Sequence, residues 1–333
     1  MGLTNDAPTA DTAALLAVDA GNSKTDVAVL TGDGRVVGAA RGGGFRPPAV
    51  GVRAAVDSLA ETVGRALAEA EVTGVRHVAA CLANADFPVE ERELADALRE
   101  RGWGATLSVR NDTFAILRAG LPAGAEPRGV AVVCGAGINC VGMTPDGRTA
   151  RFPAIGRISG DWGGGWGLAE EALWYAARAE DGRGEPTELA RTLPAHFGLP
   201  SMYALIEALH LKRIAPALKH ELTPVLFTTA ASGDRLARAI VDRLADEVVA
   251  MATVALNRLG LLTEPAPVLL GGSVLAAGHP DLDHRIRSLL EAKAPKATVR
   301  VITARPVLGA VLLGLDELGT ADEVYRKVRT HYE

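Results

Sequence analysis

The chain has 333 residues, of which 48% are hydrophobic and 4% aromatic, and its formal net charge is −5. This length can bury two cores built mainly from Ala, Val and Leu, so two domains are expected. The acidic balance argues against a nucleic-acid partner, and no apolar run approaches the length of a membrane span.

The N-terminus carries acidic residues and no basic region of the secretory type, so we expect a disordered tail over residues 1–12. The three cysteines, Cys81, Cys134 and Cys140, lie in or beside apolar strand-like runs. This favours buried reduced thiols over disulfides or a metal site. Together these features predict a cytoplasmic protein.

A strand, a polar turn, a second strand and a tight Asp-Gly turn are predicted over residues 15–35. Asp19 ends the first strand. The turn at residues 21–25 offers backbone N–H groups, two hydroxyls and a lysine, which could hold a phosphate. An ordinary hairpin with a solvated turn explains this stretch, taken alone, equally well.

The same pattern recurs at residues 130–148. Ala136 and Gly137 correspond to Ala20 and Gly21, and a second Asp-Gly-Arg turn follows. The repeat indicates two similarly built lobes, each directing a glycine loop at a shared cleft. Two facing phosphate loops indicate a nucleotide.

Strands and helices alternate after the first hairpin. Strands are predicted at 35–40, 75–82 and 105–109, and helices at 52–70, 89–99 and 114–119, which together indicate an α/β lobe. Residues 42–48, rich in Gly and Pro, are expected to be irregular, as a linker or a lid. Asn111 and Asp112 end a strand and start a helix, where α/β folds place catalytic groups, although a simple helix cap has the same pattern.

The second half of the chain is predicted to be mainly helical. Helices are expected at 168–179, 234–259, 306–318 and 322–331, with several short ones over 187–229 and strands at 267–270 and 299–302. A stretch with five glycines and Asp161 precedes the first of these helices, and it either brings a ligand close to the backbone or is merely flexible. Gly271 and Gly272 at a strand end would let a flat ring or a phosphate lie against the backbone.

Five motifs in order resemble those of the N-acetylglucosamine kinase family, also called BadF/BadG/BcrA/BcrD-type ATPases. They are DAGNSKT at 19–25, CGAGINC at 134–140, GDWG at 160–163, GGSV at 271–274 and RPVLGA at 305–310. That family belongs to the actin, hexokinase and heat-shock chaperone superfamily. The likeness extends over about residues 15–318.

The resemblance implies an α/β, two-lobed, duplicated ribonuclease-H-like fold of the actin-like ATPase type, with the nucleotide in the cleft between the lobes. The N-terminal lobe would cover residues 13–122. The C-terminal lobe would cover residues 123–333 and carry a helical insertion, and the last helix is a candidate to return to the first lobe.

The resemblance also implies roles for single residues. Asp112 would be the catalytic base and Asp19 would hold Mg²⁺, through water. ATP would be bound by the two phosphate loops and the adenosine motif, at Gly21, Asn22, Ser23, Lys24, Thr25, Gly135, Ala136, Gly137, Asn139, Gly271, Gly272 and Ser273. The sugar would be contacted by Arg46, Asn111, Asp112, Gly160, Asp161 and Trp162.

Two departures from the family concern the sugar. The family often has an Asn in the loop after the third strand, whereas residues 44–48 of this chain, which include Arg46, offer none. Trp162 stands where an acidic residue is common. An arginine in a sugar pocket could bind an acidic sugar. Phe45, Trp162 and Trp166 could each stack on a sugar ring or pack in a core or lid.

The implied activity is an ATP-dependent sugar kinase that phosphorylates an amino sugar, first N-acetylglucosamine at its 6-hydroxyl, with glucosamine or another modified hexose as the alternative. A second hypothesis is an activator-type ATPase acting on a protein partner, which would need cysteines that ligate an iron–sulfur cluster. A third is a nucleotide-gated scaffold without turnover. A homodimer is also considered, with its contact at the apolar face of the last two helices.

Overall fold

The computed structural model describes residues 13–122 and 124–332. The expected disordered tail over residues 1–12 therefore lies outside the described residues. The chain divides into two compact units. Unit 1 holds the chain up to Ala131 together with Val141–Thr149 and the segment from Ile302, and unit 2 holds Val132–Cys140 and Ala150–Val301.

The first of two five-stranded sheets in the described chain has the strand order β3-β2-β1-β4-β5. Strands β1, β2 and β3 form an antiparallel meander, and β4 and β5 run parallel to β1. Their bounds are β1 Ala13–Ala20, β2 Lys24–Thr31, β3 Val36–Gly43, β4 Val75–Leu82 and β5 Gly104–Asn111. All eight residues of β1 are buried, as expected of a central strand covered on both faces.

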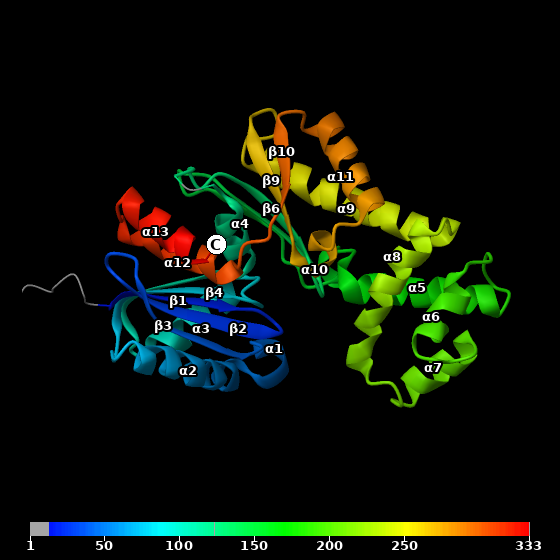
Figure 1. Ribbon diagram of the computed structural model, residues 1–333, viewed down its shortest axis with the longest axis horizontal. Coiled ribbons are helices and arrows are strands. Elements are labelled where there is room, and N and C mark those ends of the chain that lie inside the picture. The colour runs from blue at the N-terminus through cyan, green and yellow to red at the C-terminus, as the bar shows by residue number, and fades with distance from the viewer. Residues whose placement is uncertain (1–12, 123, 333) are drawn as a thin grey trace, which may run out of the picture. The chain divides into compact units, whose positions relative to one another are not determined.

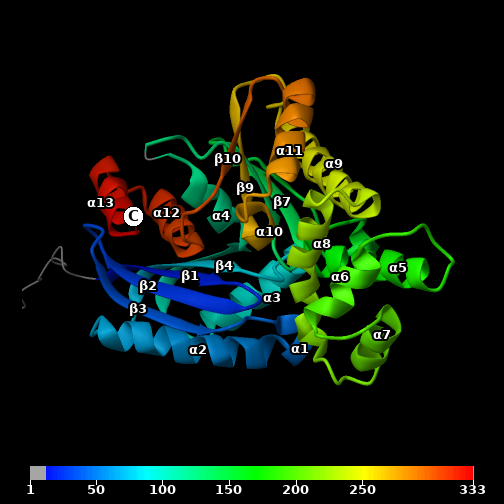
Figure 2. The same ribbon diagram turned by 45° about the vertical axis from the view of Figure 1, so that its right-hand side comes forward.

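Helices cover both faces of this sheet. Helix α2 packs on β2 and β3, and α3 on β5, while α12 packs on β1, β2 and β4 (Figure 1). Figure 2 shows α2 running along the sheet on the side opposite α12. The helices of this unit are α1 Pro47–Val50, α2 Val52–Glu69, α3 Pro88–Arg99, α4 Thr113–Gly120, α12 Pro306–Leu318 and α13 Asp322–Tyr332.

The second sheet repeats the first. Its order is β10-β9-β6-β7-β8, so three strands that are consecutive in the chain again lie beside two strands reached by crossovers. The strands are β6 Gly129–Cys134, β7 Ile138–Met143, β8 Thr149–Arg151, β9 Ala266–Gly271 and β10 Ala297–Val301, with β9 and β10 parallel. The repeated topology is that of the duplicated fold expected from the sequence.

A long helical region separates β8 from β9. Helices α5, α6, α8 and α9 pack on one another, and α11 packs on α9. The elements are η1 Arg157–Ser159, α5 Gly164–Glu180, α6 Leu189–His196, α7 Met202–His210, η2 Pro216–Glu221, α8 Leu222–Ala231, α9 Arg235–Arg258, α10 Gly272–Ala276 and α11 Pro280–Lys293. No helix among the described residues has both the length and the apolar character needed to cross a bilayer.

Three expectations about elements are corrected by the structure. Residues 42–48 are partly regular: β3 reaches Gly43 because it pairs with Lys24, and a one-turn helix starts at Pro47. Helix α11 was not expected. The apolar face of α12 is not available for a dimer contact, because its buried residues pack inside unit 1 against α4 and β1.

The expectation for the cysteines is confirmed. Cys81, Cys134 and Cys140 are free and buried. Burial raises the pKa of the Cys140 and Cys81 thiols well above the usual value, which makes both poor nucleophiles. These thiols serve as small apolar side chains in the core.

Candidate active site

Three neighbouring strands of unit 1 end at the same level. Ala20 of β1 lies opposite Leu82 of β4, which in turn lies opposite Asn111 of β5. Open α/β sheets bind their ligands at the carboxyl ends of parallel strands. The structure therefore brings the predicted Asp19, the turn at residues 21–25, Asn111 and Asp112 to one edge of this sheet.

Asp19 is a buried carboxyl group, 6% exposed, one residue before the end of β1. Burial, with the charges of Asp112 and Asp26, raises its pKa to about 8, and Lys24 acts in the opposite direction. A cation bound beside Asp19 would remove this penalty, because an opposite charge favours the ionised form.

The donor set at this edge fits Mg²⁺ held mainly by phosphates and water. Mg²⁺ takes oxygen ligands and is usually bound through one or two carboxylates together with water and substrate phosphates. Within the described ranges, no group of three or more His, Cys, Asp or Glu side chains is placed to hold a metal ion. Asp19 is the buried carboxylate at this edge, with Asp112 close enough to affect its charge, and its role in holding such an ion stays a prediction.

The first phosphate loop is a tight turn supported by the chain that follows β3. The Gly21 N–H donates to the Lys24 carbonyl at 2.9 Å, and the Phe45 N–H donates to the Gly21 carbonyl at 2.9 Å. A Cβ on Gly44 would lie 2.1 Å from the Asn22 carbonyl oxygen, so only glycine fits this contact. Residues 44–46 therefore pack directly against the loop.

Arg46 and Asn84 complete this support. Arg46 Nε donates to the Asn22 carbonyl at 2.8 Å, and Asn84 Nδ2 donates to the Asn22 side-chain oxygen at 3.1 Å. The Thr25 hydroxyl donates to the Gly43 carbonyl at 2.8 Å, which ties β2 to β3. Asn22, Ser23 and Lys24 are exposed and can meet a ligand, although Lys24 Nζ also lies 3.5 Å from Asp26.

Asp112 stands directly after β5, at the start of α4. Burial raises its pKa to about 6, and hydrogen bonds from the backbone and hydroxyl of Thr113 partly offset this effect. Its neighbour Asn111 accepts the Thr113 N–H at 3.0 Å and donates to Asp86 Oδ1 at 2.8 Å. Asp112 is thus a carboxylate with a pKa near neutrality, which suits a general base.

In unit 2 the second phosphate loop lies against the start of α5. The Gly135 N–H donates to the Gly137 carbonyl at 2.9 Å, and the Gly165 N–H donates to the Gly135 carbonyl at 2.7 Å. Gly164 has φ +75°, and a Cβ there would lie 2.5 Å from the Ala136 carbonyl oxygen. Ala136 and Gly137 themselves are exposed, so their backbone is open to a ligand.

The predicted adenosine motif touches the same loop. Gly272 has φ +84°, and a Cβ there would lie 2.5 Å from the Cys134 carbonyl oxygen. Ser273 is exposed in α10, and Asn139 Oδ1 accepts the Cys140 N–H at 2.7 Å. The two predicted nucleotide motifs of unit 2 are therefore in direct backbone contact.

The residues of unit 2 that are predicted to contact the sugar have partners within unit 2. Asp161 Oδ2 accepts the Gly156 N–H at 3.1 Å, and Gly160 ends the short helix η1 in the left-handed conformation. Trp162 is 8% exposed, donates to Glu171 at 3.2 Å and lies under the Arg243 guanidinium. Both side chains thus have structural partners, and their contact with a sugar stays a prediction.

The other two aromatic side chains differ from one another. Phe45 is 2% exposed and belongs to the core between the sheet and α2, so it packs in the core rather than stacking on a sugar. Trp166 is 36% exposed, with the Lys219 ammonium 5.3 Å from its ring centre. Of the three aromatics named from the sequence, Trp166 keeps a face that a ligand can reach.

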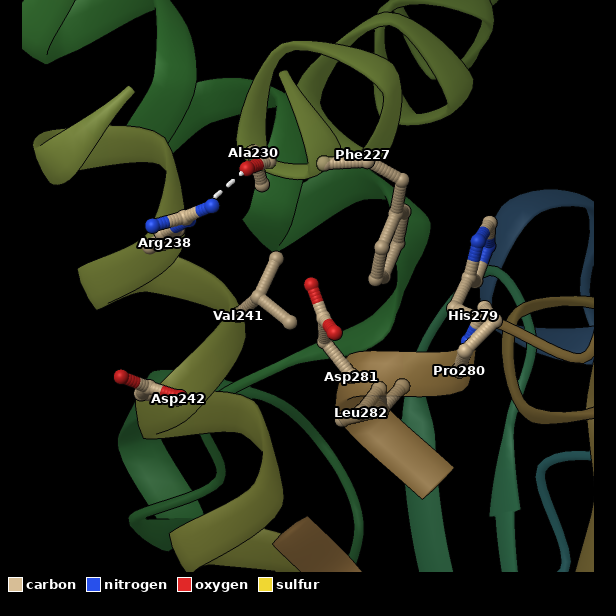
Figure 3. A pocket seen from close by; sticks show the side chains of 10 residues that line it. Phe227, Ala230, Arg238, Val241, Asp242, His279, Pro280, Asp281 and Leu282 are labelled. Atoms are coloured by element: carbon tan, nitrogen blue, oxygen red, sulfur yellow. Dashed lines mark hydrogen bonds between the residues drawn. The ribbon is translucent and has the colours of Figure 1, made fainter. Parts of the chain in front are cut away.

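A cavity of about 370 Å³ lies in unit 2 between α8, α9 and the start of α11. Its wall includes a stacked pair, with the Phe227 and His279 rings 3.7 Å apart and parallel within 1°. Figure 3 shows the Asp281 carboxylate beside Phe227 and Val241. His279 and Asp281 follow α10, which begins at the adenosine motif.

Several residues at these sites were missed from the sequence. Asn84 and Asp86 follow β4 as Asp112 follows β5, so their place after a predicted strand was a usable signal. Asn84 adopts φ +62°, which turns the chain at that edge. The residues around the unit 2 cavity come from three separate helices, so no local sequence pattern indicates the cavity.

Comparison with known proteins identifies the family. The family described as the BadF/BadG/BcrA/BcrD ATPase family matches residues 16–314. This chain belongs to that family. The expectations of family membership and of ATP use are thereby confirmed.

Two curated relatives are sugar kinases. The chain is 25% identical over 313 residues to an N-acetylmuramic acid/N-acetylglucosamine kinase of Clostridium acetobutylicum, covering 91% of this chain and 98% of the relative. It is 26% identical over 218 residues to an N-acetyl-D-glucosamine kinase of Dictyostelium discoideum, covering 65% of this chain and 67% of the relative.

The fold has a close counterpart among solved structures. A crystal structure from Chromobacterium violaceum, provisionally assigned as an N-acetylglucosamine kinase, superposes with a TM-score of 0.67 at 22% identity, covering 91% of this chain and 99% of that one. The expectation of a two-lobed, actin-like ATPase fold is confirmed by this likeness and by the family match.

Proposed function

We propose that this chain transfers the γ-phosphoryl group of ATP to an amino sugar, with N-acetylglucosamine and its 6-hydroxyl as the first candidate. The expectation of an ATP-dependent carbohydrate kinase is confirmed by the ATPase family and the curated kinase relatives. N-acetylglucosamine is favoured because both relatives carry it in their names. Glucosamine or another modified hexose is the alternative.

The observation that carries the proposal is the environment of Asp112. Its pKa of about 6 places its ionised form near neutral pH, and it lies at the same sheet edge as Asp19 and the first phosphate loop. A base with such a pKa combines the correct protonation state with useful basicity. Asp112 would accept the proton of the attacking sugar hydroxyl.

The remaining parts bind and orient the phosphates. Phosphoryl transfer depends mainly on positioning and on neutralising charge, which backbone N–H groups, Lys24 and a metal ion provide. Residues 21–25 and 135–139 would hold the phosphates and Asp19 the Mg²⁺. When bound, Mg²⁺ would supply positive charge at the transferring phosphate.

The unit 2 cavity is proposed to take the purine of ATP. Its volume lies within the usual range for small-molecule pockets, and its wall offers an aromatic face and a carboxylate that can accept hydrogen bonds. The Gly271-Gly272 turn begins the short helix that leads to His279. Ribose and phosphate would then pass along this turn.

The sugar is proposed to lie at the carboxyl edge of unit 1. Asn111 and Asp86, which bond to each other, offer an amide and a carboxylate to sugar hydroxyls. Asp161, Gly160 and Trp162 stay proposed sugar contacts. Arg46 supports the Asn22 carbonyl, so a contact with substrate would use its other guanidinium nitrogens.

The test is ADP release from MgATP by the purified protein with a panel of sugars. The panel holds N-acetylglucosamine, glucosamine, N-acetylmannosamine, N-acetylmuramic acid, glucose and a no-sugar control. We expect a strong response to one N-acetylated amino sugar and little background hydrolysis, with the phosphate located on the product by NMR. Hydrolysis that no sugar stimulates would contradict the proposal.

A further inference from the structure

A second cavity, of about 340 Å³, lies within unit 1 and has no part in the proposed catalysis. It is formed by the β2–β3 hairpin, the start of α12 and the end of α13. Its described lining contains none of the phosphate-loop or sugar-contact residues proposed above. The charged and aromatic groups that line it are Asp26, Arg41, Arg305, His331 and Tyr332.

One buried carboxylate in this cavity faces three cations. Asp26, 4% exposed, accepts from Arg41 Nε at 2.6 Å and from the Arg41 terminal nitrogen at 3.1 Å. Lys24 Nζ lies 3.5 Å from it and Arg305 3.8 Å. Lys24 belongs to the first phosphate loop, so the cavity itself keeps Arg41 and Arg305 against Asp26, an excess of one positive charge.

Of these three cations, Arg305 lies farthest from Asp26. At 3.8 Å its nitrogen is beyond hydrogen-bond distance of the carboxylate, so its donors can turn to a ligand. Its guanidinium lies 5.9 Å from the centre of the Tyr332 ring. The side chains of Arg41 and Arg305 are 56% and 55% exposed, so a solute can reach both.

We propose that this cavity binds a small phosphate monoester through Arg41 and Arg305. A phosphate monoester carries a charge near −2 at neutral pH and three strong acceptor oxygens, so it can pair with both guanidinium groups at once, whereas a carboxylate has two oxygens. Arginine pairs with phosphate through parallel N–H···O bonds. The volume suffices for a phosphate with a small hydroxylated body beside Tyr332.

The position of Asp26 gives this cavity a way to affect the active site. Asp26 on β2 lies directly opposite Asp19 on β1, and its charge acts on Asp19. A phosphate that draws Arg41 and Arg305 away from Asp26 would change the field at the carboxylate proposed to hold Mg²⁺.

The test is calorimetric titration of the full chain with glucose 6-phosphate, in the presence of Mg²⁺ and a saturating non-hydrolysable ATP analogue. The analogue fills the phosphate loops, so the binding that remains reports the cavity. We expect Arg305→Met to weaken binding by roughly tenfold or more. The control Arg326→Met removes the same charge from an exposed position on α13 outside the cavity lining and should bind as the native chain does.

A second variant helps to distinguish a loss of binding in the cavity from a loss of folding. Ala39 lines the cavity and is exposed, so Ala39→Leu should fill the space while leaving every cation in place. We expect it, too, to lose binding. Equal binding by the native chain and both variants would overturn the proposal, as would glucuronate binding as tightly as glucose 6-phosphate, or no binding once the nucleotide analogue is present.

Discussion

Burial raises the pKa of two carboxyl groups at the sheet edge by different amounts. Asp19, with Asp112 and Asp26 as like-charged neighbours, has a pKa of about 8 and would be protonated near neutral pH without a cation. Asp112 has a pKa of about 6 and would be mostly ionised there. This separation is consistent with a metal-holding role for Asp19 and a base role for Asp112.

We expect sugar phosphorylation to fall on acidification through about pH 6. Asp112 must be deprotonated to accept a proton, and its raised pKa means that this form is lost as the pH falls below that value. The measurement is kcat/KM for the sugar against pH on both sides of 6. Asp112→Asn should lower kcat by roughly 10²- to 10⁴-fold while leaving ATP binding intact. A flat profile, or a variant with native kcat, would contradict the role of Asp112.

The positions of single residues were predictable where a motif meets a strand end, while their roles stay proposals. Asp19, Asn111 and Asp112 were placed correctly because hydrophobic runs mark strands, and strand ends of an α/β sheet share an edge. The contacts of Arg46 and Phe45 could not be predicted in this way. Their packing against residues 21–22 and in the α2 core depends on pairing between β2 and β3, which sequence spacing does not give.

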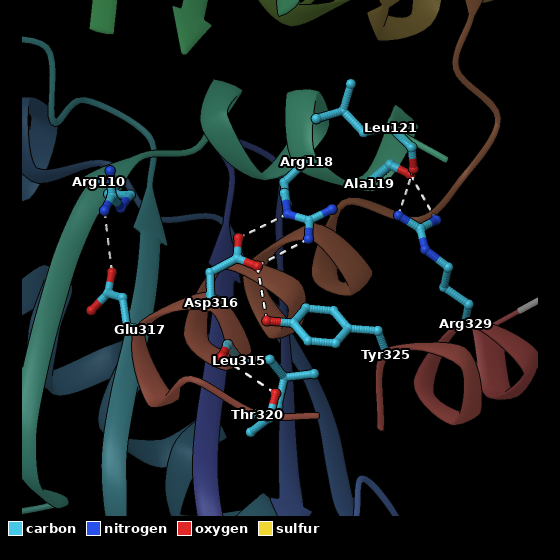
Figure 4. A network of polar contacts seen from close by, with 10 residues as sticks. All are labelled: Arg110, Arg118, Ala119, Leu121, Leu315, Asp316, Glu317, Thr320, Tyr325 and Arg329. Carbon is cyan, nitrogen blue, oxygen red and sulfur yellow. Dashed lines mark hydrogen bonds and ion pairs between the residues drawn. The ribbon is translucent and has the colours of Figure 1, made fainter. Parts of the chain in front are cut away.

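Among the elements, α12 covers one face of the sheet of unit 1. A Cβ on Gly309 would lie 1.7 Å from the Ala115 carbonyl oxygen, so α12 and α4 are in backbone contact. Figure 4 shows Arg118 of α4 forming two hydrogen bonds to Asp316 of α12, at 2.8 and 2.9 Å. At the same end of α12, Glu317 lies 3.2 Å from both His77 on β4 and Arg110 on β5. These bonds fix the helix across the parallel strands.

We expect Glu317 to make folding stability depend on acidic pH. Burial raises its pKa, but the hydrogen bond from His77 and the charge of Arg110 outweigh this and hold it below its usual value of 4.5. Its contribution is therefore fully present above about pH 4.5 and is lost as the pH falls through its lower folded pKa. Glu317→Gln should cost about 1–3 kcal/mol at neutral pH, because His77 and Arg110 lose a charged acceptor.

The measurement is urea unfolding of the native chain and the variant at neutral pH and at successively lower pH. The difference in the free energy of unfolding between the native chain and the variant should become smaller as the pH falls. Glu323→Gln, which removes the same charge from an exposed site on α13, is the control and should follow the native chain. If this difference stays constant with pH, the ion pairs of Glu317 are not its cause.

Helices with a broad apolar face were predictable from the sequence, and a helix with a narrow apolar stripe was not. The spacing of apolar residues gave α2, α9 and α12 to within a few residues. Helix α11 was missed because its buried positions, Leu282, Ile286 and Leu290, form a single narrow stripe among charged residues. The end of β3 was missed because its glycines are extended by pairing with β2, a tertiary effect that overrides local propensity.

Across the whole molecule, the chain passes between the two units four times. Unit 1 takes its sheet from the first part of the chain but α12 and α13 from the last, after the whole of unit 2. The duplicated topology was predictable because the hairpin motif occurs twice in the sequence. The return of the last helix could be offered only as a candidate, because its sequence does not indicate which lobe it packs on.

The interrupted chain of unit 1 predicts that residues 13–131 do not fold without α12. Leu308, Leu312 and Leu315 are each nearly fully buried in this unit, and full burial of such a side chain contributes about 1.5–3 kcal/mol. Their sum is comparable with the roughly 5–15 kcal/mol that holds a typical domain together. Without α12, the face of the sheet around Leu15 and Ala79 would also be exposed to water.

The fragment 13–131 should therefore show neither a cooperative thermal transition nor resistance to proteolysis. A matched single chain that joins residues 13–131 to residues 302–333 through a flexible Gly/Ser linker restores α12 and α13 to the same sheet, and should regain both properties. Circular dichroism and limited proteolysis distinguish the two outcomes. A cooperative transition in the fragment alone would mean that the sheet with α2, α3 and α4 is a stable core, and that α12 adds to unit 1 without being required for its folding.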